Sequence, residues 1–359
     1  MRVEVITPGE LSRADRERWL ALLRSNPQLT SPYFHPEFAA CVGSVRPNAR
    51  IAVLEQDGAH AYFPFQHSRL GVGAPIGGGL SDYQAVIASQ HTRFDPRELL
   101  EQCGLAIWEF DHLVAAQKPF RPFHRRITGS PFLDLSDGYE AYIRGRRDAG
   151  AKRLTELIRK GRKLEREIGG VEFVAHRVDE GLLDLVIKWK SKQCRRTGVL
   201  DYFSELAWTV PLARRIMEAN SDGFSGMLSV LYAKGRVAAA HLGMRSERAL
   251  HYWFPVFEPD GEFAPYSPGG ILLLKLAEHA ARSGISVLDL GKGDESYKAS
   301  FMSGAVQIAE GAVDTNSWPA TLWHVRQRSQ QWLRDTPALA PIREGVRAYR
   351  QLRRRASSA

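Results

Sequence analysis

The segment Ser267-Pro268-Gly269-Gly270-Ile271 has the residue types of a helix that could bind an anion through its backbone. Serine is a favoured N-cap residue, and proline suits the first helical position. Each of the two glycines that follow disfavours a helix by about 1 kcal/mol relative to alanine, which is explained if a ligand must approach the backbone closely. The free N–H groups at the positive end of such a helix can hold a phosphate. An ordinary cap followed by two loop glycines is the alternative.

The segment 291–298 (GKGDESYK) directly follows a predicted strand over 286–290. Ligands in open α/β sheets bind beyond the carboxyl ends of strands, so this segment is well placed to line a site. Tyr297 and Lys298 are its candidate side chains, with core packing and a solvated helix position as the respective alternatives. Asp289, inside the strand, is expected to have a structural role, because a buried carboxylate needs a partner such as a lysine.

A predicted strand over 249–257 contains Pro255. Proline has no backbone N–H to donate to a neighbouring strand. A sheet that splays apart at this point would leave backbone groups free for a ligand. An edge strand is the other interpretation.

A proton acceptor is harder to assign from the sequence. His241 lies in the middle of the predicted strand 236–244, and its imidazole could take a proton if its face of the sheet lines a cleft. A hydrogen-bonded core histidine is the alternative. His251, Glu258 and Asp294 are rival candidates.

The order of these features, with three antiparallel strands, an S-P-G-x-L-L-L helix and a strand ending in D-x-G-x-G-D-E-x-Y-K-x-x-F, resembles the GNAT acetyltransferase superfamily. More narrowly, it resembles the CelD/BcsL branch, named for cellulose-biosynthesis proteins and similar to the Fem peptidyl transferases. A weaker echo lies at 31–38 (SPYFHPEF) and 79–83 (GLSDY). The residues that carry the main resemblance are Ser267, Pro268, Gly269, Leu272, Leu273, Leu274, Asp289, Gly291, Gly293, Asp294, Tyr297, Lys298 and Phe301.

The resemblance implies that acyl-CoA binds between two splayed strands, 249–257 and 286–290. Its diphosphate would contact the amides of 269–271, and its pantetheine arm would pair with backbone near 253–256. The candidate residues for binding acyl-CoA are Trp253, Phe254, Val256, Ser267, Gly269, Gly270, Ile271 and Lys298. Tyr297 matches the GNAT tyrosine that protonates the leaving thiolate, and His241 and Asp294 complete the catalytic candidates. The strand 249–257 lacks the glutamate that many GNAT enzymes use as their base.

The function implied by the resemblance is N-acylation of an amino sugar in an exopolysaccharide, an envelope polysaccharide or a precursor of one. The donor would be acetyl-CoA or another acyl-CoA, and no metal is expected. Two alternatives stay open: a Fem-like transferase that uses aminoacyl-tRNA, and a non-catalytic GNAT-like binder of an anionic ligand or a membrane.

The composition is that of a folded protein with room for two lobes. The chain has 359 residues, of which 44% are hydrophobic and 25% charged, which excludes a disordered chain. No run of apolar residues is long enough to span a bilayer, and the N-terminus lacks the apolar core of a secretion signal. The three cysteines do not form a disulfide framework. We expect a cytoplasmic protein, with a peripheral position at the inner membrane face as a variant.

The net charge of +9 comes from two basic segments, 144–167 and 316–359, and basic excess indicates an anionic partner. Residues 144–167 carry ten Lys/Arg against four acids, which an amphipathic connecting helix explains. The arginine-rich stretch 342–355 has an apolar stripe and could bind anionic lipid or a nucleotide second messenger, or form a solvated terminal helix. Nucleic acid is disfavoured because 143–170 contains no aromatic residue for base stacking.

Together these patterns predict an α/β protein of two tandem GNAT-like lobes with mixed, mostly antiparallel sheets flanked by helices. The expected boundaries are 1–138 for the N-terminal lobe, 139–170 for a basic helical connector, 171–315 for the C-terminal lobe with the acyl-CoA site, and 316–359 for a basic helical tail.

Overall fold

The computed structural model describes residues 1–56, 58–68, 70–293, 296–315, 317 and 321. The predictions for the basic tail and for Asp294 therefore lie outside the described residues. Within the described part, no helix is long and apolar enough to cross a bilayer.

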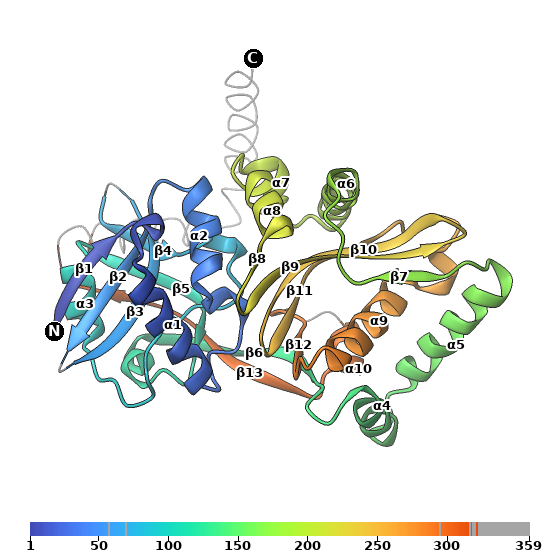
Figure 1. Cartoon of the computed structure of the whole chain (residues 1–359), viewed down its shortest axis with the longest axis horizontal. Helices are drawn as coiled ribbons and strands as arrows, with labels where there is room; N and C mark the ends of the chain where they lie inside the picture. Colours follow the sequence, from blue (N-terminus) through green and yellow to red (C-terminus); the bar gives the residue numbers. More distant parts are fainter. Residues whose placement is uncertain (57, 69, 294–295, 316, 318–320, 322–359) are drawn as a thin grey trace, which may run out of the picture.

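A single 13-stranded sheet runs through both halves of the chain (Figure 1). Its order is β1-β2-β3-β4-β5-β13-β6-β12-β11-β10-β9-β7, and β8 pairs with β9 off this path. The strands are β1 (Arg2–Ile6), β2 (Ala49–Gln56), β3 (Ala59–His67), β4 (Val72–Pro75), β5 (Ile107–Val114), β6 (His124–Asp134), β7 (Glu172–Val174), β8 (Asn220–Ser221), β9 (Phe224–Ala233), β10 (Arg236–Ser246), β11 (Ala249–Phe257), β12 (Val287–Asp289) and β13 (Gly304–Asp314).

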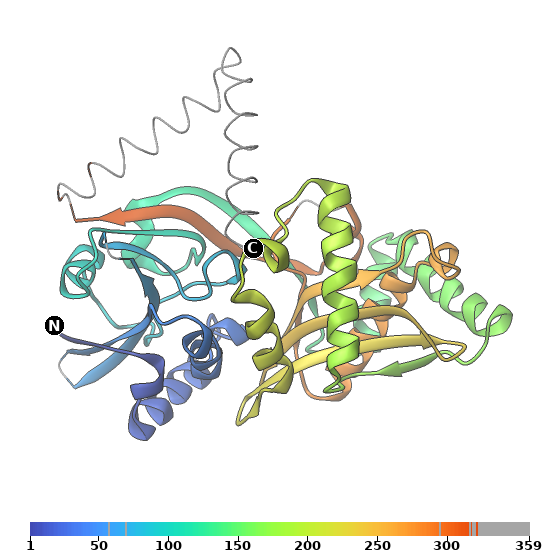
Figure 2. The same ribbon diagram turned by 90° about the horizontal axis from the view of Figure 1, so that it is seen from above.

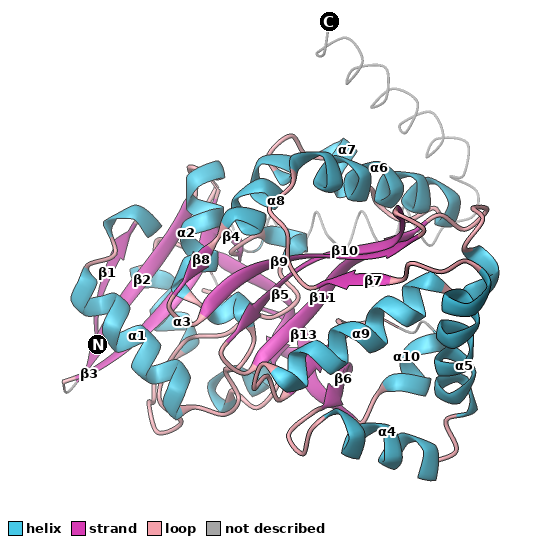
Figure 3. Cartoon of the chain, turned by 45° about the vertical axis from the view of Figure 1, so that its right-hand side comes forward, coloured by secondary structure: helices cyan, strands magenta, loops and turns pink. Residues whose placement is uncertain are grey.

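Helices cover both faces of the sheet (Figure 3). In the C-terminal half, α6 and α8 lie on one face, whereas α4, α5, α9 and α10 lie on the other. The helices are α1 (Arg13–Ser25), α2 (Pro36–Val45), α3 (Pro96–Gln102), α4 (Tyr139–Asp148), α5 (Lys152–Glu167), α6 (Glu180–Thr197), α7 (Tyr202–Glu205), α8 (Thr209–Glu218), α9 (Pro268–Arg282) and α10 (Ser296–Phe301).

The two halves of the sheet are joined by an exchange of strands. The last strand, β13, lies between β5 and β6 of the N-terminal half, and β6 in turn pairs with β12 of the C-terminal half. Figure 2 shows β6 and β13 running together from one half into the other. A mixed and mostly antiparallel sheet was expected, and it is confirmed: among the described strands, only the β4·β5 and β11·β12 ladders are parallel.

Local sequence explains the elements that shape the C-terminal half. Lys234 and Gly235 both have positive φ, 50° and 69°, so they form the tight turn that joins β9 to β10. The predicted connecting helix is interrupted at Gly150, whose φ of 79° ends α4 before α5 begins. The apolar residues of α9 are buried with those of α5 in one core against the sheet.

Candidate functional site

The strands β11 and β12 form a fork. Their parallel ladder has three pairs and ends at His251↔Asp289, where β12 stops. Beyond this point β11 continues to Phe257, paired with β10 on its other side. In the described part of the chain, the edge of β11 from Tyr252 to Phe257 therefore has no partner strand. The predicted splaying of these two strands is present in the structure.

A β-bulge in β11 begins where the fork opens. Leu242 of β10 pairs with Phe254, whereas Met244 pairs with His251. Two residues of β11, Tyr252 and Trp253, therefore oppose the single residue Gly243. A Cβ at Gly243 would lie 2.3 Å from the His251 carbonyl oxygen, so only glycine fits there. Such a bulge bends a strand away from its neighbour.

His241 is enclosed behind this bulge and not exposed in the fork. Its side chain is fully buried, and its Nε2 accepts the Trp253 backbone N–H at 3.3 Å. The ring stacks on Tyr252 with 4.8 Å between centroids. Burial lowers the pKa of His241 to about 3. A neutral, enclosed imidazole whose acceptor nitrogen is already engaged corresponds to the core-histidine alternative.

The helix α9 begins beside the open edge of β11. The Tyr252 hydroxyl donates to the Gly269 carbonyl at 3.4 Å, and a Cβ at Gly269 would lie 3.0 Å from the Phe257 ring. The expectation that the Ser267 side chain caps this helix is wrong. Ser267 is left-handed, with φ 59° and ψ 56°, and its Oγ accepts a hydrogen bond from Lys160 Nζ at 3.0 Å.

The backbone amides at this helix start are only partly available to a ligand. The N–H groups of Gly270 and Ile271 both donate to the Ser267 carbonyl, at 3.0 and 3.2 Å. Among the described residues, the Gly269 amide is the one of the three predicted contacts without a protein acceptor. Gly270 faces α5, because a Cβ there would lie 2.6 Å from Leu157 Cδ2. Close packing of two helices therefore explains this glycine without a ligand.

Positive charge reaches the start of α9 from α5. Lys160 contacts Ser267 and also pairs with Glu156 at 3.1 Å. Lys163 lies over the ring of Tyr266, 5.8 Å from its centroid. The basic connector segment thus supplies cations beside the helix end that was predicted to bind phosphate.

A buried imidazole between two carboxylates marks the apex of the fork. His251 Nε2 lies 2.8 Å from Asp82 Oδ2, and its Nδ1 lies 3.2 Å from Asp289 Oδ1. His251 is fully buried, and the two carboxylates overcome the effect of burial and raise its pKa to about 9. Asp289 also accepts hydrogen bonds from the Tyr83 hydroxyl at 2.5 Å and the Gly291 amide at 2.7 Å.

The cluster continues from His251 toward the surface. Asp82 Oδ1 lies 3.9 Å from His112 Nε2, and His112 Nδ1 lies 3.0 Å from Asp111 Oδ1. The exposed fraction of these side chains is 0% for His251, 25% for Asp82, 14% for His112 and 54% for Asp111. Acidic and imidazole groups thus alternate from the buried apex to solvent.

Sequence reasoning identified this cluster only in part. His251 was a rival base, Asp289 had an expected structural role, and Asp82 was noted only within the segment 79–83. Asp82 and His251 are 169 residues apart in the sequence, so no local spacing could indicate their contact. The one signal in the sequence was the weak resemblance of the segment 79–83 to the GNAT superfamily.

Tyr297 and Lys298 both lie on the short helix α10. Lys298 is 5% exposed, and its Nζ donates to the carbonyls of Gly291 and Lys292, each at 3.1 Å. It therefore holds the loop that follows β12. Tyr297 is half-buried and packs edge-on against Phe301. Burial raises the pKa of Tyr252, and the Tyr297 phenol adds to that rise.

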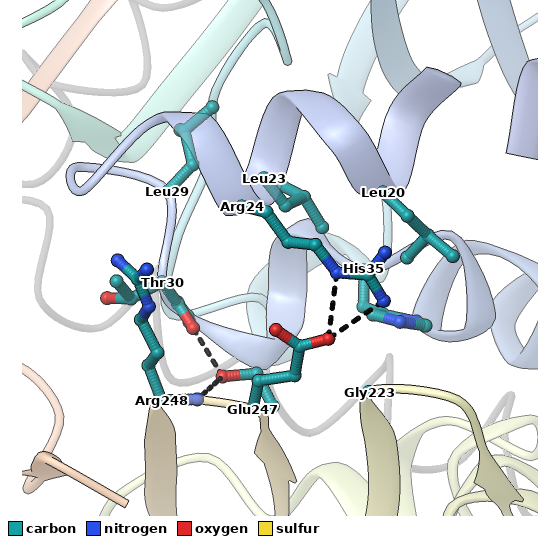
Figure 4. A pocket seen from close by; sticks show the side chains of 11 residues that line it. Leu20, Leu23, Arg24, Leu29, Thr30, His35, Gly223, Glu247 and Arg248 are labelled. Carbon is teal, nitrogen blue, oxygen red and sulfur yellow. Dashed lines mark hydrogen bonds and ion pairs between the residues drawn. The ribbon is translucent and has the colours of Figure 1, made fainter. Parts of the chain in front are cut away.

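A separate pocket lies at the beginning of β11 (Figure 4). The fork opens toward the other end of that strand. The pocket is bounded by α1 and by the turn before β11. Arg24 crosses it to pair with Glu247 at 3.0 Å and also pairs with Asp222 at 3.1 Å. Its cation is thus already neutralised, and none of the predicted site residues lines this pocket.

Comparison with known proteins identifies a domain family in the C-terminal half of the chain. Residues 151–299 match the family model described as Acetyltransferase (GNAT) domain. Residues 151–299 therefore carry a GNAT acetyltransferase domain, and the predicted GNAT-like α/β fold is confirmed. No curated protein matches the sequence.

Several solved structures are similar to the whole chain. A crystal structure of FemX has a TM-score of 0.56 and 11% identity, over 90% of this chain and 99% of its own. A conserved protein of unknown function from Bacteroides thetaiotaomicron has a TM-score of 0.50 and 12% identity, over 87% and 98%. A tandem GNAT protein from the clavulanic acid biosynthesis pathway has a TM-score of 0.47 and 9% identity, over 88% and 99%. At these identities the likeness concerns the fold alone.

Proposed function

We propose that the protein transfers an acyl group, most simply acetyl, from acyl-CoA to an amine, with the donor bound in the fork between β11 and β12. The observation that carries this proposal is the end of the parallel ladder at His251 and Asp289, beside the start of α9. An extended pantetheine arm contains amide groups, which can pair with the open edge of β11 as an added strand would.

The donor-binding residues predicted from the sequence remain part of the proposal. Trp253, Phe254 and Val256 belong to the open edge of β11, and Pro255 between them offers no N–H. The phosphate end of the donor would contact the Gly269 amide and the Lys160 ammonium. Ser267, Gly270, Ile271 and Lys298 would then act by shaping the helix start and the neighbouring loop.

The transfer itself needs two proton movements. The amine nitrogen attacks the thioester carbon, a C–N bond forms and the C–S bond breaks. The amine loses a proton, and the departing thiolate gains one. Tyr297 is the proposed proton donor; because a phenol has a pKa near 10 and a thiol near 8.5, its position matters more than its acidity.

The cluster at the apex is our proposed path for the proton of the amine. His251, with its raised pKa of about 9, stays protonated at neutral pH and balances Asp82 and Asp289. The second oxygen of Asp82 is then able to orient the ammonium form of the acceptor. The proton that the ammonium loses would pass to His112 and leave through Asp111, which is the most exposed of these groups.

The acceptor is proposed from the resemblance in sequence to the CelD/BcsL branch. It would be an amino sugar of an exopolysaccharide, an envelope polysaccharide or a precursor. The alternative is a Fem-like transfer from aminoacyl-tRNA, which the similarity of the fold to FemX and the cations of α5 favour. Steep weakening of tRNA binding with salt would support that alternative.

The first test is calorimetric titration with acetyl-CoA, followed by detection of free CoA thiol with glucosamine as the probe acceptor. At acetyl-CoA one hundredfold above its Kd, the free energy of unfolding should rise by about 2.7 kcal/mol. Tyr297→Phe should lower kcat while leaving the Kd of acetyl-CoA unchanged. A protein that does not bind acetyl-CoA at millimolar concentration would contradict the proposed function.

A further inference from the structure

We propose that His241 is a positioning residue that keeps β11 bulged and thereby holds the fork open for the acyl donor. The inference rests on the proposed function, because it assigns to this residue the shape of the donor site. It replaces the role of base that the sequence suggested for His241.

The bulge leaves a backbone donor without a partner strand, and His241 provides the acceptor. In a regular ladder, the Trp253 N–H would bond to a carbonyl of β10. Here it donates to His241 Nε2 at 3.3 Å instead. An unsatisfied N–H at this buried position would destabilise the bulged strand.

The neighbours of His241 fit this role. Gly243 lacks a Cβ where one would lie 2.4 Å from His241 Nε2. The residue directly opposite His241 in the ladder is Pro255, which has no N–H to compete for the imidazole. The side chain at 241 therefore occupies a space that two neighbouring residues leave open.

The same imidazole connects the bulge to the start of α9. Its ring stacks on Tyr252, with 4.8 Å between centroids and 21° between planes. The Tyr252 hydroxyl donates to the Gly269 carbonyl at 3.4 Å. A change at His241 should thus disturb both the open edge of β11 and the helix end beside it.

The acceptor role requires a neutral ring with the proton on Nδ1. Because the imidazole is fully buried, its pKa is lowered to about 3, and the hydrogen bond persists throughout the neutral range. Two titratable side chains face it: Tyr252, which stacks on the ring, and His251, whose positive charge further disfavours protonation of His241.

Three substitutions separate this role from general core packing. Glutamine can place its carbonyl oxygen near the position of Nε2, whereas asparagine is one methylene too short, and phenylalanine keeps the ring but has no acceptor. Ser229→Ala is the matched control, because Ser229 is fully buried on β9 opposite His241 and its hydroxyl bonds to Ala175.

The measurements are the Kd of acetyl-CoA by calorimetry and the exchange rate of the Trp253 amide by NMR. We expect His241→Phe and His241→Asn to raise the Kd roughly tenfold and to speed exchange of the Trp253 amide. His241→Gln should remain within about threefold of the wild type, and Ser229→Ala should not change the Kd. If His241→Phe does not fold, the difference in Kd and in Trp253 amide exchange between His241→Asn and His241→Gln tests the proposal.

The proposal is overturned if Asn and Gln variants bind acetyl-CoA equally, or if Ser229→Ala weakens binding as much as His241→Asn. Failure of the wild-type protein to bind acetyl-CoA would refute the proposed function and the role of His241 in donor binding. Exchange of the Trp253 amide would still decide whether His241 maintains the bulge.

Discussion

His251 joins the two halves of the protein through charge. Its imidazole lies between Asp82 from the N-terminal half and Asp289 from the C-terminal half, and it forms the last pair of the ladder before the fork opens. Because the group is buried, its interactions with these carboxylates are weakly screened by solvent. The stability of the protein should therefore depend on the charge of this residue.

The predicted pH dependence follows from the raised pKa of His251. In the unfolded chain the pKa is near 6.5, and in the folded protein it is about 9. The stabilisation is therefore fully present below pH 6.5 and is lost as pH rises through 9; it amounts to roughly 3 kcal/mol. Urea unfolding at pH 6, 7.5 and 9.5 should show this loss in the wild type and not in His251→Gln. Parallel pH curves for the two proteins would exclude the assignment.

At the scale of single residues, the sequence indicated the strands that form the fork, and it left the roles of the two histidines open. Pro255 and the motif of 267–301 correctly located the fork. The roles of His241 and His251 could not be separated, because both alternate on predicted strands and their surroundings come from distant segments. The bulge opposite Gly243 determines the surroundings of both histidines. The bulge is a one-residue shift in strand pairing, and the hydrophobic pattern of the sequence does not reveal such a shift.

The packing of α5 against α9 explains part of the glycine pattern at the helix start. Gly161 of α5 lies against Ile271, and Gly270 of α9 lies against Leu157. Each helix thus presents a glycine to a side chain of the other, which lets the two helices approach closely. Because the helices are close, Lys160 of α5 contacts Ser267 at the start of α9. The same packing therefore places a positive charge at the candidate phosphate site.

Gly270→Val is predicted to destabilise the protein by about 1–3 kcal/mol through overpacking against Leu157. Leu157→Ala alone should destabilise the protein by about 2–5 kcal/mol, because Leu157 is buried. The double variant should be destabilised by less than the sum of the two single changes, because the second change removes the atoms that the new valine would meet. Gly145→Ala is the control: no atom lies within 4 Å of a Cβ there, so it should be neutral or stabilising by up to about 1 kcal/mol. Urea unfolding of Gly270→Val, Leu157→Ala, the double variant and Gly145→Ala measures these effects, and additive effects of Gly270→Val and Leu157→Ala would contradict this packing.

At the scale of the whole molecule, the strand exchange makes the two lobes one structure. β13 pairs with β5 and β6, and β6 pairs with β12. The segments on the two sides of the predicted boundary at residue 138 therefore share one sheet. Sequence reasoning divided the chain at its helical connector, because composition changes there. The insertion of the last strand between two earlier ones has no local signal, since strand partners are set by the whole sheet.

The strand exchange also explains how a site can draw on both halves. Asp82 and Tyr83 come from the N-terminal half, and they contact His251 and Asp289 beside β6. The GNAT domain match begins at residue 151, so these two residues lie outside it. The candidate site is therefore completed by the N-terminal half.

The most direct test of the account is amide hydrogen exchange of the full chain with and without acetyl-CoA. We predict that acetyl-CoA slows exchange at 252–257 and 267–271, the open edge of β11 and the start of α9. Slower exchange confined to other regions, such as the pocket formed by α1 and the turn before β11, would contradict the claim that the fork binds the donor.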